Sequence, residues 1–372
     1  MNPVDNLKWC SGCVAMSTRP RIAFDENGLC NACRWAEKKK TLDWESRVDI
    51  LKGILSEQKK KGKTFDCLVP VSGGKDGSYV SYQLKHVYGM NPLCVTIQPA
   101  LPIDLGIKNL HQFIGSGYDH VMISPSATGM QKLNRFGFIE LGFPYYGWLI
   151  SIHSAVIRVA RQYNIDLIFY GEDGEVEYGG TSKTEDSPFY DINYQKQIYL
   201  EGGYEASIQN AGLTPNERFF FEYPEQDEQL DQIRLTHWSY FENWDPYRNY
   251  IIAKEHCGLT EADSTNSGTF TNFAQNDQFL YPLHSYMMYL KFGFGRANQD
   301  ASIEVRRGAM SRDQAINLVR LYDGMFPSEY LDMYLDYYQM SEDEFMAVID
   351  RWANKDILEK RDGFWKPKFS IS

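Results

Sequence analysis

The stretch Val69-Pro-Val-Ser-Gly-Gly-Lys-Asp-Gly-Ser78 decides how this chain is expected to fold. The apolar run before it, residues 65–69, is typical of a buried strand, and residues 79–88 after it are typical of a helix that ends at Gly89. A strand, a glycine-rich turn and a helix start make an anion site, because the turn leaves backbone N–H groups free and the helix dipole favours negative charge. The stretch therefore predicts a phosphate-binding turn, with a plain glycine-rich connection as the alternative.

The side chains of this turn suit a phosphate and a metal ion. Gly73 and Gly74 let the backbone approach a phosphate, because no Cβ stands in the way. The polar groups of the turn are the hydroxyls of Ser72 and Ser78, the ammonium of Lys75, and the carboxylate of Asp76, which can cap a helix or bind a metal.

The spacing excludes two common phosphate motifs, the Walker A loop and the dinucleotide-binding turn G-x-G-x-x-G. The string Ser72-Gly-Gly-Lys-Asp76 resembles instead the PP-loop of the ATP pyrophosphatase superfamily. Members of that superfamily cleave ATP between the α and β phosphates and adenylate a carbonyl oxygen. Their commonest loop, S-G-G-x-D-S, has a serine where this chain has Gly77, and Ser78 follows one position later. The resemblance implies that residues 72–78 bind ATP and pyrophosphate together with Mg²⁺.

Composition limits the classes of function. With 372 residues and 43% apolar content, the chain can form one large or two ordinary globular domains. Its net charge of −11 argues against an extended basic surface for nucleic acid. We see no secretory signal and no run near the roughly 18 apolar residues of a membrane span, so we expect a cytoplasmic protein without a membrane partner.

Four of the seven cysteines form two C-x-x-C pairs near the start of the chain, Cys10 with Cys13 and Cys30 with Cys33. This spacing predicts a structural zinc site, in which four thiolates leave no coordination position open. Two disulfides are disfavoured in a reducing cytoplasm, and an iron–sulfur cluster is the other alternative. We expect residues 1–40 to form a zinc-ribbon-like module that depends on the metal for its fold.

A linker helix is expected in residues 41–63, because apolar residues recur at helical spacing between positions 43 and 61. The basic run at positions 58–63 ends this helix. A solvated helix end that satisfies the helix dipole is favoured there over a contact with nucleic acid.

Residues 64–171 alternate between strand and helix patterns. Strands are expected at 92–97, 119–124 and 166–170, and helices at 104–114 and 148–163. This alternation predicts an α/β fold with a parallel sheet covered on both faces. Ligands of such sheets bind at the carboxyl ends of the strands, so we expect Gln98, Glu172 and Asp173 beside the glycine-rich turn. The two acidic residues would hold a magnesium ion or face the substrate, or else cap a helix.

The rest of the chain divides into two regions. Residues 172–285 are rich in Gly, Tyr, Asn and Phe, which suits an aromatic substrate-binding insertion in a domain spanning residues 64–285. Residues 286–372 are expected to be helical. Their early part carries a group of cations, Lys291, Arg296, Arg306 and Arg307. We expect this group to bind a phosphate or carboxylate of the substrate, with ion pairing to Asp300 and Glu304 as the alternative.

Over nearly its whole length the chain resembles the N-acetyl sugar amidotransferase family, which acts in O-antigen and nonulosonic-acid pathways. The resemblance rests on the double C-x-x-C, the PP-loop and the segment Lys291-Phe-Gly-Phe-Gly-Arg296 followed by Arg306-Arg-Gly308. It implies ATP-dependent conversion of a sugar acetamido group, in a nucleotide-linked sugar, into an acetamidino group, with release of AMP and pyrophosphate. The catalytic residues it implies are Lys75, Asp76, Glu172 and Asp173.

The source of ammonia is expected to be a separate protein. An N-terminal-nucleophile glutaminase needs a cysteine at the second position, where this chain has Asn2. The resemblance therefore implies the synthetase half of an amidotransferase, supplied with ammonia by glutaminase and cyclase-like proteins. The alternative function is a PP-loop tRNA-modifying enzyme, either a thiolation enzyme or a lysidine-type ligase. The negative charge, and the position of Cys67 and Cys94 in predicted buried strands, argue against it. A non-catalytic sugar-binding scaffold is a third alternative.

Overall fold

The computed structural model describes residues 3–371, so Asn2 lies outside the described residues. A five-stranded parallel sheet forms its centre, in the spatial order β3-β2-β1-β4-β5. The strands are β1 (Cys67–Pro70), β2 (Pro92–Ile97), β3 (His120–Ile123), β4 (Leu167–Tyr170) and β5 (Arg234–His237). The predicted α/β fold with a parallel sheet is confirmed. The fifth strand was not predicted, because Arg-Leu-Thr-His is no continuous apolar run.

The strand order creates a crevice at one point of the sheet. The chain runs from β1 outward to β2 and β3, then crosses over to β4 on the other side of β1. The loops that follow β1 and β4 therefore leave the sheet in opposite directions, which opens a crevice at their carboxyl ends. The glycine-rich stretch follows β1 and Glu172 follows β4, so both reach this crevice.

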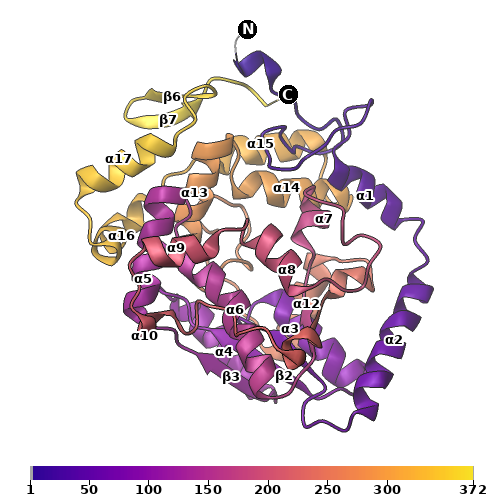
Figure 1. Cartoon of the computed structure of the whole chain (residues 1–372). Helices are drawn as coiled ribbons and strands as arrows, with labels where there is room; N and C mark the ends of the chain where they lie inside the picture. Colours follow the sequence, from indigo (N-terminus) through magenta and orange to yellow (C-terminus); the bar gives the residue numbers. More distant parts are fainter. Residues whose placement is uncertain (1–2, 372) are drawn as a thin grey trace.

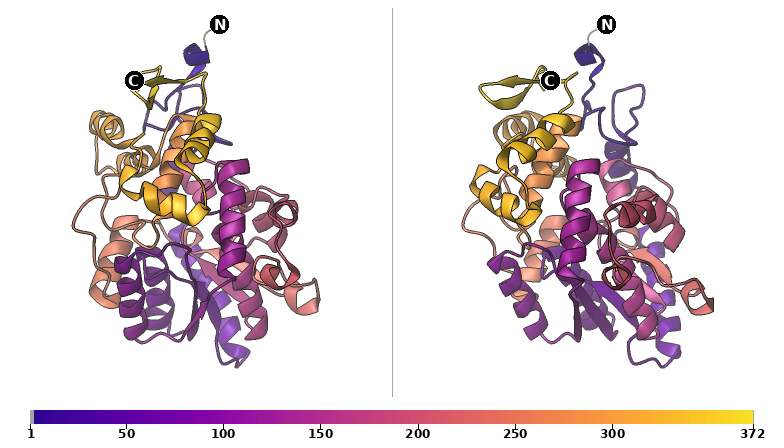
Figure 2. Two further views of the ribbon diagram at one scale, coloured as in Figure 1. Left: turned by 90° about the vertical axis from the view of Figure 1, so that its left-hand side faces the viewer. Right: turned by 60° about the vertical axis from the view of Figure 1, so that its left-hand side comes forward.

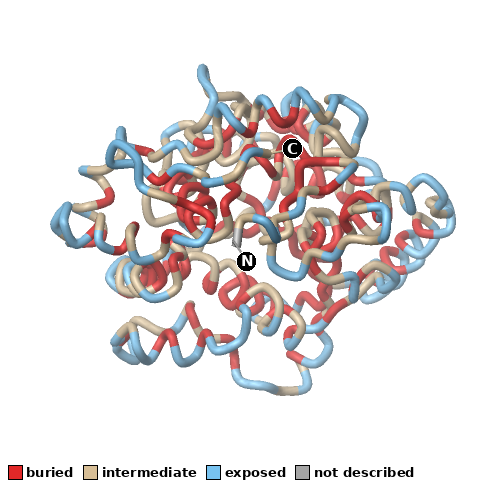
Figure 3. Tube along the Cα trace, turned by 90° about the horizontal axis from the view of Figure 1, so that it is seen from above, coloured by how far each residue is buried: buried red, intermediate tan, exposed pale blue. Residues whose placement is uncertain are grey.

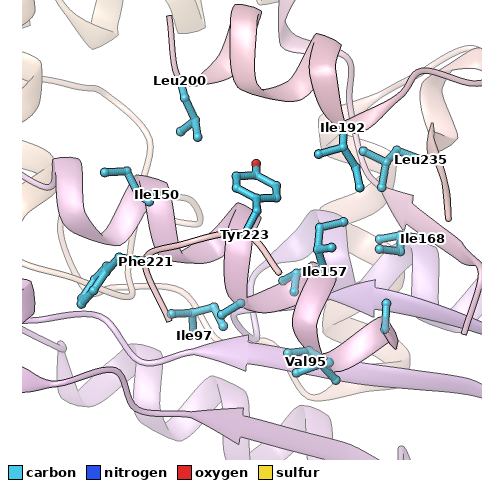
Figure 4. Close-up of a cluster of buried hydrophobic side chains, with 14 of the residues drawn as sticks. Val95, Ile97, Ile150, Ile157, Ile168, Ile192, Leu200, Phe221, Tyr223 and Leu235 are labelled. Atoms are coloured by element: carbon cyan, nitrogen blue, oxygen red, sulfur yellow. The ribbon is translucent and has the colours of Figure 1, made fainter. Parts of the chain in front are cut away.

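Successive side chains of β1 point to opposite faces of the sheet, and both faces are buried there. Leu68 packs under α5 (Ala127–Phe136) and α6 (Tyr146–Gln162), whereas Cys67 and Val69 pack on the opposite face. That opposite face is covered by α2 (Trp44–Lys60), α3 (Lys75–Tyr82) and α4 (Asp104–Gly115). Figure 4 shows the first face, where side chains of β2, β4 and β5 meet Ile150 and Ile157 of α6. Figure 3 shows that the buried segments lie inside a rim of exposed chain.

Short helices follow the sheet strands and complete this part of the chain. They are the π-helical turns η2 (Gln83–Val87), η3 (Gly137–Leu141) and η4 (Gln195–Tyr199), then α7 (Gly174–Tyr178), α8 (Ile192–Tyr194), α9 (Tyr204–Asn210), α10 (Pro215–Arg218), α11 (Glu228–Asp231), the 3₁₀ turn η5 (Trp238–Tyr240) and α12 (Pro246–Cys257). Several aromatics of the predicted insertion are core residues: the Tyr190 ring stacks on His237, with centroids 4.6 Å apart.

The C-terminal region is largely helical, as predicted. It contains α13 (Leu280–Phe292), α14 (Arg296–Arg306), α15 (Arg312–Tyr322), the turn η6 (Ser328–Tyr330), α16 (Leu331–Tyr338) and α17 (Glu342–Trp352). An antiparallel hairpin of β6 (Leu358–Arg361) and β7 (Phe364–Pro367) follows, which was not predicted. α13, α16, α17 and the hairpin share a core that includes Tyr334, Tyr338 and Phe345, whereas α14 and α15 pack in a separate cluster. The C-terminal helices stand at the opposite end of the molecule from the outer strands of the sheet (Figure 2).

Residues 3–40 form a small unit, the cysteine module, that lies beside the C-terminal helices (Figure 1). It consists of the 3₁₀ turn η1 (Pro3–Asn6), irregular chain with isolated bridges, and α1 (Asn31–Lys39). Within residues 3–371, no helix has both the length and the hydropathy that crossing a bilayer requires.

Candidate functional site

A cavity of about 260 Å³ lies over the glycine-rich turn; we call it the first cavity. Residues 72–77 form one side of it, and residues 273–277 with Gly106 and Asn109 of α4 form the other. Glu172, Tyr281 and Arg296 also line it. The crevice between β1 and β4 is therefore a real cavity with both signs of charge on its walls.

Close backbone contacts fix the shape of the turn. Gly73 has a φ of +78°, and a Cβ there would lie 2.4 Å from the backbone nitrogen of Leu110. Gly77 is closely packed as well: a Cβ there would lie 3.0 Å from the carbonyl oxygen of Pro70 and 3.1 Å from Val71. The missing side chain at Gly77 allows the start of α3 to pack directly against the end of β1.

Replacing Gly73 by alanine is expected to lower the free energy of unfolding by at least about 1–3 kcal/mol, since alanine is strained at this φ and its Cβ would collide with α4. Thermal unfolding measures the loss, and titration with ATP should show weaker binding. Gly53→Ala in α2 is the matched control: a Cβ there meets nothing within 4 Å, and the helix should gain up to about 1 kcal/mol. Wild-type behaviour of the Gly73 variant would contradict the predicted backbone contact.

Three charged side chains meet at the floor of the first cavity. Lys75 donates to Asp76, and the other oxygen of Asp76 accepts from Nδ2 of Asn249 in α12 at 3.2 Å. Glu172 accepts a hydrogen bond from the Tyr178 hydroxyl at 2.5 Å. Burial raises the pKa of Glu172, and the charge of Asp76 raises it further, whereas Lys75 lowers it. Asp76 and Glu172 offer two carboxylates in one cavity, and such oxygen ligands fit a Mg²⁺ ion.

Three other predicted site residues, Asp173, Ser78 and Gln98, do not line the first cavity. Asp173 does not line the first cavity: it caps α7, accepting from the backbone N–H groups of Glu175 at 3.0 Å and Val176 at 3.3 Å. The helix-cap alternative describes it. Ser78 is fully buried within α3 and does not line the first cavity either. Gln98 is exposed and accepts from the Ser124 hydroxyl at 2.5 Å.

The predicted group of four cations is divided between different places. Lys291 lies away from the cavities described here: it donates to the carbonyl of Leu141 at 2.9 Å and covers the Trp352 ring. Arg296 lines the first cavity and pairs with Asp300 at 2.8 Å, so the ion-pair alternative holds for it as well. Arg306 and Arg307 line a different cavity.

This second cavity has a volume of about 240 Å³ and shares Glu172 with the first. Its walls come from four parts of the chain: the end of α1, Glu172 with α7, residues 243–246, and the end of α14. Glu172 therefore stands between two cavities, one over the glycine-rich turn and one beside the cysteine module.

Sequence analysis missed the far wall of the first cavity. Asp277 lines it, and burial raises the pKa of this carboxyl to about 6. The hydroxyl of Tyr281 donates to Asp277 at 3.3 Å. Neither residue belongs to a motif, and a Cβ on Gly106 would lie 2.5 Å from the Cα of Asp277. Backbone hydrogen bonds between residues 101–103 and 277–279 hold the same segment, and no sequence pattern marks these contacts.

The four cysteines Cys10, Cys13, Cys30 and Cys33 gather in one buried cluster, with their Sγ atoms all within 4.8 Å of one another. Backbone N–H groups point at the sulfurs, as from Cys30 to the Sγ of Cys10 at 3.2 Å. Four buried sulfurs at this spacing fit a tetrahedral zinc ion and leave no open coordination position.

The cysteine module holds α7, the short helix that follows Glu172. Trp35 Nε1 and Lys39 Nζ both donate to the carboxylate of Glu177 at 2.8 Å. Arg21 forms a two-pronged pair with Glu175, at 2.7 and 2.9 Å. Arg306 connects both parts, with Nη1 at 3.8 Å from the Cys13 sulfur and Nη2 at 3.1 Å from the Glu177 carbonyl. Figure 1 shows α1, α7 and α14 close together.

Comparisons with known proteins concern parts of the chain. Residues 267–369 match the family model described as "LPS biosynthesis protein WbpG-like, C-terminal domain". An uncharacterized protein of Methanocaldococcus jannaschii is 33% identical over 101 residues, which span 27% of this chain and 36% of that protein. The family match supports a role in LPS or sugar biosynthesis, and hence a biosynthetic enzyme.

Proposed function

We propose that this chain is the synthetase subunit of an ATP-dependent sugar amidotransferase, which converts an acetamido group into an acetamidino group. The observation that carries the proposal is the meeting of Lys75, Asp76 and Glu172 in one cavity over the glycine-rich turn. The match of residues 267–369 to a family of LPS biosynthesis supports the sugar as the class of substrate.

The reaction needs an activated amide, because an amide carbonyl is a poor electrophile. The acetamido oxygen attacks the α-phosphorus of ATP, the bond to the β-phosphate oxygen breaks, and pyrophosphate leaves. The adenylated carbon then accepts the electron pair of ammonia. AMP leaves with the former amide oxygen, and loss of protons to water gives the amidine. The balance is one ATP and one ammonia consumed for one AMP and one pyrophosphate.

Different residues of the first cavity would have different roles in this reaction. The backbone N–H groups of residues 72–74 and the ammonium of Lys75 would hold the β- and γ-phosphates and stabilise charge on the departing pyrophosphate. Asp76 and Glu172 would hold Mg²⁺, which neutralises phosphate charge. A bound cation would also resolve the repulsion that raises the pKa of Glu172. Arg296, half-buried beside its partner Asp300, places a guanidinium in the same cavity.

Ammonia would come from separate glutaminase and cyclase-like proteins. The cysteine cluster, loaded with zinc, would have a structural part only, since four thiolates saturate the ion. The net charge of −11 argues against a nucleic-acid substrate.

The decisive experiment incubates the purified chain with ATP, Mg²⁺, ammonium chloride and a panel of acetamido sugars, both free and nucleotide-linked. We expect AMP and pyrophosphate in equal amounts, together with a product whose mass shows oxygen replaced by an NH group. Glutamine in place of ammonium should give no product without a partner protein. If no sugar of the panel yields AMP above the rate without sugar, the proposed reaction is wrong.

A further inference from the structure

The second cavity adjoins the first at Glu172. Glu172 lines both cavities, and the Tyr178 ring that hydrogen-bonds to it lines the second. A ligand in the second cavity would therefore meet the first cavity at Glu172. If ATP occupies the first cavity, another substrate in the second cavity would adjoin it at Glu172.

The cationic side chains that line the second cavity differ in how far their N–H donors are already paired within the protein. Lys39 pairs with Glu177 at 2.8 Å, and Arg306 is occupied by the Glu177 carbonyl and the Cys13 sulfur. Arg307 has long ion pairs, 3.5 Å to Glu304 and 4.0 Å to Asp245, and lies over the Tyr247 ring at 5.3 Å from its centroid; its side chain is 25% exposed. Lys40 is mostly exposed and pairs with Glu37 at the surface. Arg307 and Lys40 therefore keep N–H donors for a ligand.

Aromatic surfaces complete this cavity. Trp244 is 5% exposed and lines it. The apolar faces of Trp244, Tyr178 and Ile303 suit the face of a sugar ring.

We propose that the second cavity is the acceptor subsite, in which Arg307 and Lys40 bind an oxyanion of the sugar, a phosphate or a carboxylate, while the acetamido group lies toward Glu172. This inference rests on the proposed function for the identity of the acceptor. The cysteine module is then a wall of the substrate site through α1. A guanidinium suits both oxyanions, because its planar fork donates two parallel hydrogen bonds.

Calorimetric titration tests this subsite with defined probes. The full chain, saturated with Mg²⁺ and α,β-methylene ATP, is titrated with N-acetylglucosamine 1-phosphate, glucuronic acid and neutral N-acetylglucosamine. We expect at least one acidic probe to bind, and Arg307→Gln to weaken it by about tenfold or more, since a charge-assisted hydrogen bond is lost. Lys40→Ala should weaken it less, and the weak binding of the neutral sugar should stay unchanged. Whichever acidic probe binds identifies the oxyanion.

The controls separate this subsite from the first cavity. Arg361→Ala, an exposed arginine on β6, should bind the probes as the wild type does. Thermal unfolding checks that each variant is folded. The subsite is disproved if neither acidic probe binds, or if Lys75→Met removes probe binding while Arg307→Gln leaves it intact. Arginine-dependent probe binding without AMP formation from any acetamido sugar would instead disprove the proposed reaction alone.

Discussion

Replacing Lys75 by methionine is expected to lower the rate of AMP formation by roughly a hundred- to a thousandfold, the range found when one preorganised electrostatic donor is removed. Lys75 lines the first cavity with a side chain that is only 12% exposed, so solvent screens its charge little. Methionine keeps the length of the side chain and removes the charge beside the departing pyrophosphate. The loss should appear in the rate at saturating ATP, measured as AMP release with ammonium and an acetamido sugar.

Lys52→Met is the matched control for this variant. Lys52 is exposed on α2 and pairs with Asp49 within the same helix, so its loss should change neither rate nor stability by much. Lys75→Met must also unfold near the wild-type temperature for the comparison to count. A Lys75 variant that is folded and retains more than about half of the activity would remove the glycine-rich turn from the reaction.

The sheet could be predicted from sequence where its strands are apolar runs. β1, β2 and β4 follow this pattern because both faces of the sheet are buried there. The edge strand β3 was predicted from its apolar residues as well, although Met122 is 46% exposed. β5 escaped prediction because its position depends on pairing with β4, not on its own composition. Cys257, which stands beside His256 and Gly258 in the sequence, is 1% exposed because α12 packs against α3. Tertiary packing of this kind leaves no local signal.

The near wall of the first cavity could be predicted, and the far wall could not. Residues 72–77 form a contiguous motif whose geometry follows from a strand, two glycines and a helix start. Asp277 reaches the same cavity from a segment 200 residues away through backbone contacts with residues 101–106. Lys291 and Arg296 are close in the sequence, but Lys291 lies at the end of α13 and Arg296 at the start of α14. Their side chains therefore have different partners, the Leu141 carbonyl and Asp300. When a helix ends between two charged residues, their spacing in the sequence does not determine where their side chains point.

The cysteine module connects metal binding to the candidate site through α7. This helix has five residues, too few to be stable alone, so its position depends on contacts from outside. Those contacts come largely from the module: Trp35 and Lys39 on Glu177, and Arg21 on Glu175. Because Tyr178 at the end of α7 donates to Glu172, a disordered module would release the carboxylate that both cavities share.

Cys13→Ser is therefore expected to abolish zinc binding and to increase hydrogen exchange in residues 174–178 by about a hundredfold. The estimate follows from losing two hydrogen bonds to a charged carboxylate, about 3 kcal/mol together, where each 1.4 kcal/mol is tenfold. Metal analysis should give one zinc per wild-type chain and none in the variant. AMP formation should fall strongly, while ATP binding should persist, because β1, α3 and α4 hold the glycine-rich turn without help from the module.

Cys257→Ala controls for loss of a buried thiol outside the cluster. It should keep zinc and the protection of α7, with a modest loss of stability of about 1 kcal/mol. The separation of ATP binding from AMP formation is the sharp part of this prediction, since a protein that merely unfolds would lose both. If Cys13→Ser loses zinc and yet keeps both the protection of α7 and the wild-type rate, the module does not position Glu172. The contacts on Glu177 would then be packing without consequence for the site.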